Sequence, residues 1–254
     1  MTDYEILPTN MALAERAAEL IYDAAREAIA ARGRFILALT GGSSPRQTYE
    51  LLARATPEQM DWAKVFIFLG DERFVPYDDE NSNFGMCRKL LLDHVPIPKE
   101  QLCPIPTGTA TPQEAADQYA ETLSRVFDTP MGGAPPALDM ILLGMGDDGH
   151  CASLFPGMPS LTVTDAWTLP TPPGTLPPPV ERVTMTFPVL NAARSVLFLV
   201  EGAKKAPAVR DILEGGAAVN VHPSAGVQPT NGKLLWLLDH TAAERLSTQQ
   251  SPKP

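Results

Sequence analysis

The stretch LDMILLGMGDDGHCASLFPG, residues 138–157, places a short apolar run directly before a glycine-rich loop that carries acidic residues and a histidine. The apolar part, 138–145, is typical of a strand that is buried on both faces of a sheet. Four other short runs have the same character: RFILAL at 34–39, KVFIFL at 64–69, SVLFLVE at 195–201 and KLLWLLD at 233–239. Together these runs predict a mainly parallel sheet that is covered by helices on both faces.

Helical patterns lie between these runs. Residues 11–32 carry apolar side chains at the spacing of three and four positions that is typical of an amphipathic helix. Asn10 is expected to cap the start of this helix, and Gly33 follows its end.

A second helix is predicted over residues 111–128. Thr111 stands at the N-cap, Pro112 at the first helical position and Glu114 at the third, which is the pattern of a capping box. Helical stretches are also expected after the last two apolar runs. This alternation of strands and helices predicts an α/β fold with a mainly parallel sheet.

The chain of 254 residues is expected to form a single domain over 1–254. One segment interrupts the alternation: between residues 170 and 179 there are six prolines, which exclude a regular helix or a central strand. A linker between domains is one interpretation. We favour a proline-rich surface excursion at about 158–180, because the alternation resumes unchanged after it.

Composition narrows the class of protein and its partners. The net charge of −10 disfavours nucleic acid and anionic lipid as partners, so we expect neither nucleic acid nor membrane binding. The sequence has no apolar window long enough for a membrane span and no signal-peptide pattern, so we expect a cytoplasmic protein. Cys87, Cys103 and Cys151 form no C-x-x-C pair, which disfavours a structural zinc site.

Ligands of open parallel sheets bind beyond the carboxyl ends of the strands, and three polar loops occupy that position. The first follows the run at 34–39. Gly41 and Gly42 would let the backbone approach a ligand, and Ser43 or Ser44 could cap the next helix, with Pro45 in its first turn. Free N–H groups and hydroxyls suit a phosphate. A capped turn without any ligand explains the same residues.

The second loop follows the run at 64–69 and contains Asp71, Glu72 and Arg73. A guanidinium binds phosphate or carboxylate with two parallel hydrogen bonds, so Arg73 is a candidate ligand for an anion. The acidic run at 78–80 is more simply interpreted as a solvated surface segment.

The third loop is the glycine-rich part of the opening stretch. His150 could act as a general base near neutral pH, and Asp148 could orient its ring or raise its basicity. Alternatively, His150 could only hydrogen-bond a local turn. Asp147, Asp148 and His150 could also ligate a metal, but this spacing does not make a metal site, and we predict none.

Cations elsewhere in the chain could complete an anion site. Arg182 stands at the start of a strand expected at 183–186, and Lys204 and Lys205 follow the run at 195–201. Each could be an ordinary surface charge. Their positions next to strand ends allow them to converge with Arg73 on one anion.

Taken together, LTGGSSPRQTY, GDERFVP…NSNFG, GMGDDGHCASLFP, ERVTMTFPVL and VEGAKKA resemble the 6-phosphogluconolactonase family in order and spacing, over nearly the whole chain. The resemblance implies a three-layer α/β/α sandwich with the modified Rossmann-like core that the glucosamine-6-phosphate deaminases share. It implies no dissociable cofactor. It also implies hydrolysis of 6-phospho-D-glucono-1,5-lactone to 6-phospho-D-gluconate, the second step of the oxidative pentose phosphate pathway. We expect a monomer or a weak dimer.

The resemblance also implies roles for particular residues. His150 matches the family's proposed base with Asp148 beside it, and Asp71 matches an acid/base carboxylate of the deaminases. The resemblance places Gly41, Gly42 and Ser43 in the sugar-phosphate loop, and Ser44 of the same loop is a further substrate-binding candidate. It also implies that Arg182 and Lys205 bind the phosphate and that Arg73 lines the pocket.

Two other functions stay open. The deaminases carry a glutamate that assists ring opening after the histidine, whereas this chain has Ser153, Leu154, Phe155 and Pro156 there. Sugar-phosphate sensors reuse the same core without chemistry, but no DNA-binding segment is recognisable here. Cys151 departs from the threonine that is common in the lactonases, and we do not expect it to be a nucleophile.

Overall fold

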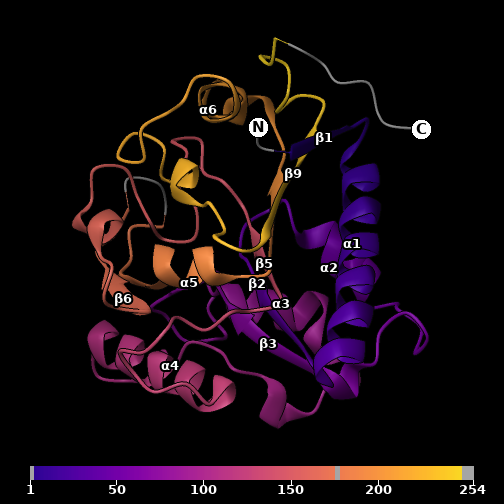
Figure 1. The fold of residues 1–254 in the computed structure, drawn as a ribbon, viewed down its shortest axis with the longest axis vertical. Helices are drawn as coiled ribbons and strands as arrows, with labels where there is room; N and C mark the ends of the chain where they lie inside the picture. Colours follow the sequence, from indigo (N-terminus) through magenta and orange to yellow (C-terminus); the bar gives the residue numbers. More distant parts are fainter. Residues whose placement is uncertain (1–2, 175–177, 248–254) are drawn as a thin grey trace.

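The computed structural model describes residues 3–174 and 178–247, and its centre is a parallel sheet of six strands. The strand order is β1-β9-β8-β5-β2-β3. Figure 1 shows α1 along one side of these strands and α4 and α5 on the other. The predicted α/β fold is therefore confirmed. The strands are β1 (Asp3–Leu7), β2 (Phe35–Leu39), β3 (Val65–Leu69), β5 (Met140–Leu143), β8 (Ser195–Val200) and β9 (Lys233–Asp239).

The helices that cover the sheet vary widely in length, and α1 is by far the longest. No helix in residues 3–174 and 178–247 is long and apolar enough to cross a bilayer. The α-helices are α1 (Asn10–Arg32), α2 (Arg46–Leu52), α3 (Asn83–Leu90), α4 (Pro112–Phe127), α5 (Phe187–Ala192) and α6 (Ala206–Leu213).

A second, antiparallel sheet of three strands lies beside the parallel one, in the order β4-β7-β6. Its strands are β4 (Asp71–Arg73), β6 (Thr168–Thr171) and β7 (Arg182–Met185). The sequence pattern did not predict β4, β6 or β1. As an edge strand, β6 tolerates the proline at its third position, because no described strand pairs with its outer side. Residues 175–177 of the proline-rich segment lie outside the described residues.

The predicted start of α1 is wrong by one residue. Thr9, not Asn10, is the N-cap: its backbone is extended, and its hydroxyl accepts a hydrogen bond from the Ala12 N–H at 3.0 Å. Asn10 is already helical, so its side chain cannot cap. The predicted end is confirmed, since Gly33 has a left-handed φ of 76° and donates its N–H to Ile29.

The other helix predictions had mixed outcomes. The start of α4 is confirmed, because the Thr111 hydroxyl accepts from the Glu114 N–H at 3.2 Å. The Glu114 carboxylate in turn accepts from the N–H of Ala110, one residue before the cap. The helix α6 follows β8 as expected, whereas residues 240–245 after β9 form turns.

Two buried tyrosines hold the carboxyl ends of the central strands. The Tyr49 hydroxyl of α2 accepts from the N–H of Thr40 at 2.9 Å and donates to its carbonyl at 2.8 Å. The Tyr119 hydroxyl of α4 does the same with Leu69, at 2.8 and 2.7 Å. Both tyrosines are 0% exposed. The ends of β2 and β3, where polar loops begin, are therefore tied to the helices on either side.

We predict that Tyr119→Phe lowers the free energy of unfolding by about 1–3 kcal/mol, because it leaves the buried backbone groups of Leu69 without their partner. Urea unfolding of the variant and the wild type measures this difference. Tyr22→Phe is the matched control, since Tyr22 lies partly buried on α1 and its change should cost little. Equal stabilities of the two variants would contradict the prediction.

Candidate active site

A cavity of about 220 Å³ opens where β2, β3 and β5 end. The loop after β2 contributes its glycines and serines, the glycine-rich loop after β5 contributes His150, and the small sheet contributes carboxylate and guanidinium groups. Of the predicted site residues, only Asp148 does not line the cavity. Those that line it are Gly41, Gly42, Ser43, Ser44, Asp71, Arg73, His150, Arg182 and Lys205.

His150 and Asp148 form a hydrogen-bonded pair on the loop after β5. His150 Nδ1 lies 2.6 Å from Asp148 Oδ1, which also accepts from the His150 N–H at 3.1 Å. Burial would raise the pKa of Asp148, but the hydrogen bonds from His150 outweigh burial and hold it below its ordinary value. Because an ionised carboxylate only accepts, Nδ1 must carry the proton. In the neutral imidazole, the form that a general base requires, Nε2 is then left as an acceptor.

The glycines of this loop make the pair possible. A Cβ on Gly146 would lie 2.1 Å from His150 Nδ1 and 2.7 Å from the Asp148 carboxylate, which no side chain could accommodate. The Gly146 N–H also donates to the His150 carbonyl at 2.8 Å and so closes the turn. Gly149 has a φ of 82°, in the left-handed region that favours glycine.

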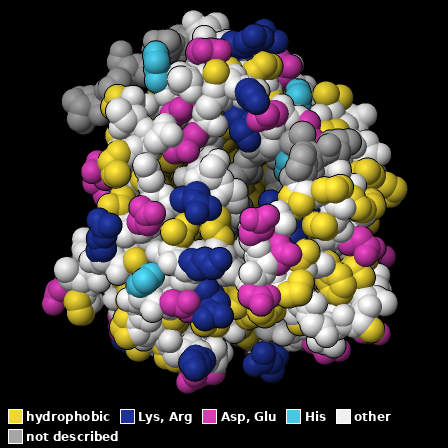
Figure 2. Space-filling model, turned by 180° about the vertical axis from the view of Figure 1, so that it is seen from behind, with side chains coloured by type: hydrophobic (Ala, Val, Ile, Leu, Met, Phe, Trp, Pro, Cys, Tyr) yellow, Lys and Arg dark blue, Asp and Glu magenta, His cyan; other side chains and the backbone are white. Residues whose placement is uncertain are grey.

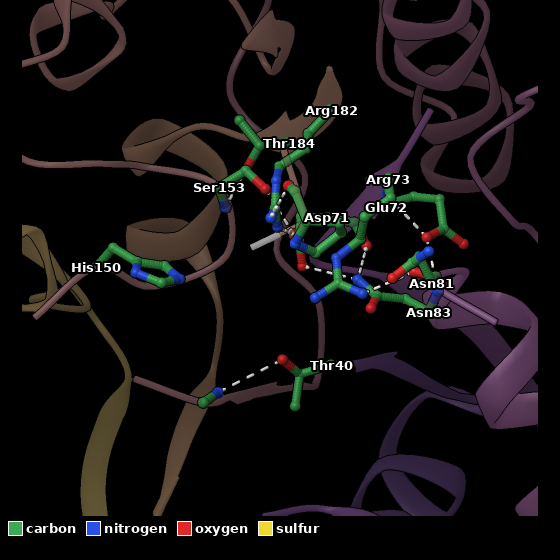
Figure 3. A network of polar contacts seen from close by, with 12 residues as sticks. Thr40, Asp71, Glu72, Arg73, Asn81, Asn83, His150, Ser153, Arg182 and Thr184 are labelled. Carbon is green, nitrogen blue, oxygen red and sulfur yellow. Dashed lines mark hydrogen bonds and ion pairs between the residues drawn. The ribbon is translucent and has the colours of Figure 1, made fainter. Parts of the chain in front are cut away.

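Asp71 lies buried beneath the cavity and is held from two directions. The Ser153 hydroxyl donates to Asp71 Oδ2 at 2.6 Å, and the Asn83 amide donates to the Asp71 carbonyl at 3.0 Å. Arg182 Nη1 lies 4.0 Å from the same carboxylate oxygen. Figure 3 shows this group on one side and His150 on the other, with the imidazole pointing toward the space between them.

Arg73 and Arg182 bring two guanidinium groups to the cavity. The register of β4 and β7 places these two residues directly opposite each other. Arg73 donates to the Asn81 carbonyl at 2.7 Å, and Arg182 donates to the Pro178 carbonyl at 3.3 Å. In both side chains the buried Nε has no acceptor among the described residues. Burial also lowers the pKa of Arg182, which is 4% exposed.

Lys205 approaches the cavity from a different strand. It ends the short 3-10 turn Ala203–Lys205 that follows β8. Its ammonium donates to the Met145 carbonyl and lies 3.5 Å from the carboxylate of Asp147. The neighbouring Lys204 is exposed and does not line the cavity. Figure 2 shows that Lys and Arg side chains gather along the middle of one face, although the net charge of the chain is −10.

Glu72 binds the start of α3 and does not line the cavity. Its carboxylate accepts from the N–H groups of Asn83 and Phe84, each at 2.7 Å, and from the Ser82 hydroxyl at 3.0 Å. Burial raises the pKa of Glu72 to about 7, against the lowering effect of these backbone hydrogen bonds. Glu72 therefore holds the start of α3 and does not face the cavity, although it stands between two residues that do.

The prediction that Ser43 or Ser44 caps the next helix is wrong. The residue before α2 is Pro45, and in the described part of the chain no side-chain hydrogen bond caps this helix. The backbone carbonyl of Ser43 instead accepts from the Arg46 N–H at 3.2 Å. Since the turn is closed by backbone groups alone, both serines are free to line the cavity.

Among the residues at the site that sequence reasoning missed, two hold Asp71 in place. Asn83 lines the cavity, and its amide lies so close to Gly41 that a Cβ there would be 1.9 Å from Asn83 Oδ1. It stands in the NSNFG motif, whose position after the polar loop was the available signal. Ser153 stands in the GMGDDGHCASLFP motif, but the motif gave no sign of its contact with Asp71, which spans 82 residues of sequence.

The described residues offer neither a reactive thiol beside His150 nor a metal site that could take over its role. Cys151 is fully buried, and burial raises the pKa of its thiol to about 12, so it is unreactive at neutral pH. In residues 3–174 and 178–247, no three His, Cys, Asp or Glu side chains converge as metal ligands would.

Comparison with known proteins identifies the family. Residues 8–236 match the family described as glucosamine-6-phosphate isomerases/6-phosphogluconolactonase. The 6-phosphogluconolactonase of Synechocystis is 42% identical over 95% of this chain and 97% of its own. The human 6-phosphogluconolactonase is 41% identical over 85% and 83%.

Solved structures agree with this assignment. The 6-phosphogluconolactonase of Trypanosoma cruzi superposes with a TM-score of 0.87 at 27% identity, covering 98% of both chains. A monomeric glucosamine-6-phosphate deaminase, at 21% identity and a TM-score of 0.79, shares the fold. The chain thus belongs to the glucosamine-6-phosphate isomerase/6-phosphogluconolactonase family.

Proposed function

We propose that the protein hydrolyses 6-phospho-D-glucono-1,5-lactone to 6-phospho-D-gluconate. The observation that carries this proposal is the arrangement around His150: its Nδ1 is fixed by Asp148, and its ring faces a cavity that also holds Arg73, Arg182 and Lys205. A base and a cluster of cations in one cavity suit an anionic substrate with a hydrolysable bond. Relatives named 6-phosphogluconolactonase over almost the whole chain support the same reaction.

The register of the small sheet supports the phosphate as the anion. Like charges directly opposite each other on neighbouring strands repel, and Arg73 stands opposite Arg182. The Asp71 carboxylate lies 4.0 Å from Arg182 and forms no ion pair with Arg73 among the described residues. A phosphate between the two guanidinium groups would remove the repulsion and satisfy their buried N–H groups.

We assign the phosphate to Arg182, Lys205 and the loop of Gly41, Gly42, Ser43 and Ser44, and we place Arg73 beside them. The backbone N–H groups of Gly42, Ser43 and Ser44 have no backbone acceptor among the described residues. Together with the serine hydroxyls, they can donate to phosphate oxygens. An anchor at carbon 6 would hold the lactone carbonyl in a fixed position near His150.

The reaction then follows from the state of the imidazole. His150 Nε2 takes a proton from water while the water oxygen bonds to the lactone carbonyl carbon, and the carbonyl π electrons move to its oxygen. When the carbonyl re-forms, the bond to the ring oxygen breaks. His150 returns the proton to that oxygen, and the product is an open-chain acid. Asp148 stabilises the imidazolium that exists between the two steps.

Asp71 supports this scheme as a counter-charge. Its carboxylate is held by Ser153 and Asn83 and lies near Arg182, so it can fix the guanidinium in the cavity. The prediction that Asp71 itself transfers a proton, as its counterpart in deaminases would, stays a prediction.

Several wider expectations are part of the proposal. The reaction is the second step of the oxidative pentose phosphate pathway, and we place the protein there, in the cytoplasm, as a single domain and a monomer or weak dimer. The substrate is the sugar-phosphate lactone alone, with no cofactor and no nucleic acid or membrane partner.

The direct test adds purified protein to freshly prepared lactone and follows acid release against spontaneous hydrolysis. If the protein is a lactonase, acid release should be well above the rate of spontaneous hydrolysis. The same protein should not liberate ammonia from glucosamine 6-phosphate, because residues 153–156 supply no acidic side chain for ring opening. Binding of the phosphosugar without acid release would instead indicate a sensor.

We predict that His150→Ala lowers kcat by about 10²–10⁴-fold with little change in KM, because the base is lost while the phosphate contacts remain. Its melting temperature should stay close to that of the wild type. His240→Ala is the control, since His240 is exposed and lies outside the cavity. A folded His150→Ala protein with normal turnover would contradict the assignment.

We further predict that Lys205→Ala and Arg182→Ala each weaken substrate binding, since each removes a charge-assisted contact worth about 1.5–3 kcal/mol. The loss, measured as KM or as inhibition by 6-phosphogluconate, should be much smaller for a lactone without phosphate. Lys204→Ala should behave as the wild type, because that neighbouring lysine does not line the cavity. Equal losses on both lactones would rule out these residues as phosphate ligands.

A further inference from the structure

His222 contacts the glycine-rich loop and does not line the cavity. It directly precedes the short 3-10 turn Pro223–Gly226. Its Nδ1 lies 3.0 Å from the backbone carbonyl of Asp148, and its side chain is 15% exposed. A carbonyl can only accept, so Nδ1 carries the hydrogen and donates it. His222 therefore binds the backbone of the same residue whose carboxylate holds His150.

Two further contacts fix the loop at this point. The ring of His222 packs so closely on Gly149 that a Cβ there would lie 2.5 Å from His222 Nδ1. The Gly149 carbonyl accepts from the Ser224 N–H at 2.9 Å. The peptide on each side of Gly149 is thus bound from outside the loop, by residues 222 and 224.

The other edge of the His222 ring faces α6. Its Nε2 lies 3.6 Å from Asp211 Oδ2, and Arg210 binds the other oxygen of that carboxylate at 2.6 Å. The backbone N–H of His222 donates to the Ala218 carbonyl at 3.0 Å. The imidazole is therefore held by its own segment and by a helix, so it can act as a rigid support for the loop.

A support is needed because this loop is rich in glycine. Gly144, Gly146 and Gly149 each lose much conformational entropy when they are fixed. Thr40 and Lys205 also form hydrogen bonds to this loop from outside: Thr40 accepts from the Gly144 N–H at 3.4 Å, and Lys205 donates to the Met145 carbonyl. Thr40 and Lys205 line the cavity, whereas His222 does not line it.

We infer that His222 is a positioning residue for the proposed reaction: its hydrogen bond to the Asp148 carbonyl holds the Asp148–His150 pair in the orientation that proton transfer requires. This inference rests on the proposed function. Among the described residues, His222 does not line the cavity and forms no hydrogen bond or ion pair with His150, so it acts through the loop. Losing it should lower the rate of the chemical step and leave the phosphate anchor intact.

The test uses a matched pair, His222→Asn and His222→Leu. Asparagine keeps an N–H donor at the δ position, where it can still reach the Asp148 carbonyl, whereas leucine places a methyl group there. We expect His222→Leu to lower kcat by about 10–100-fold with KM within about twofold of the wild type. His222→Asn should recover most of this loss, although both variants lose the contact with Asp211. A turnover of folded His222→Leu equal to the wild type, or equal losses in both variants, would overturn the inference.

Hydrogen exchange provides a readout that does not depend on substrate. The N–H groups of Gly146, Gly149 and His150 are all bonded within the loop. Their exchange, followed by mass spectrometry, should accelerate in His222→Leu and stay near the wild-type rate in His222→Asn. Unchanged exchange in His222→Leu would overturn the inference. A wild type that exchanges as expected but hydrolyses no lactone would instead refute the proposed function.

Discussion

The pairing of backbone groups where buried parallel strands end is the constraint on which this structure depends. Strand β2 is buried along its whole length, so its last peptide cannot be solvated. The hydroxyl of Tyr49 pairs with the backbone N–H and carbonyl of Thr40 at the end of β2, and the hydroxyl of Tyr119 pairs with those of Leu69 at the end of β3. Because these ends are fixed, the polar loops that follow them start from fixed positions. The cavity is the space between those loops.

The small antiparallel sheet concentrates positive charge at the cavity of a protein whose net charge is −10. Its pairing brings Arg73 and Arg182 together from positions more than a hundred residues apart in the chain. The buried carboxylate of Asp71 offsets part of the charge, and Ser153 holds that carboxylate in place. Glu72, the residue between Asp71 and Arg73, turns to the opposite face and fixes α3. Alternation along one short strand therefore separates a site residue from a structural one.

The glycine-rich loop has little side-chain bulk of its own and is held in place by contacts from other elements. Gly146 leaves room for the contact between Asp148 and His150, and Gly149 leaves room for His222. The same absence of side chains would make the loop mobile in isolation. Contacts from several elements outside it supply the restraint, and those elements are far away in the sequence. The geometry of the base is therefore a property of the whole fold.

The sequence by itself determined the central strands of the parallel sheet, the two longest helices and most of the cavity lining. Apolar runs such as 34–39 mark buried strands, and in a parallel sheet the residues that follow them must meet at one edge. That rule brought Gly41, Arg73 and His150 together without coordinates. It could not predict β4, because a strand of three residues is too short to show an alternating pattern. It also could not choose the N-cap of α1, because Thr9 and Asn10 are adjacent and both residue types are good caps. Only the tertiary structure decided that Glu72 faces inward, that Ser153 holds Asp71 and that His222 supports the loop, since each depends on contacts between distant segments that no local pattern encodes.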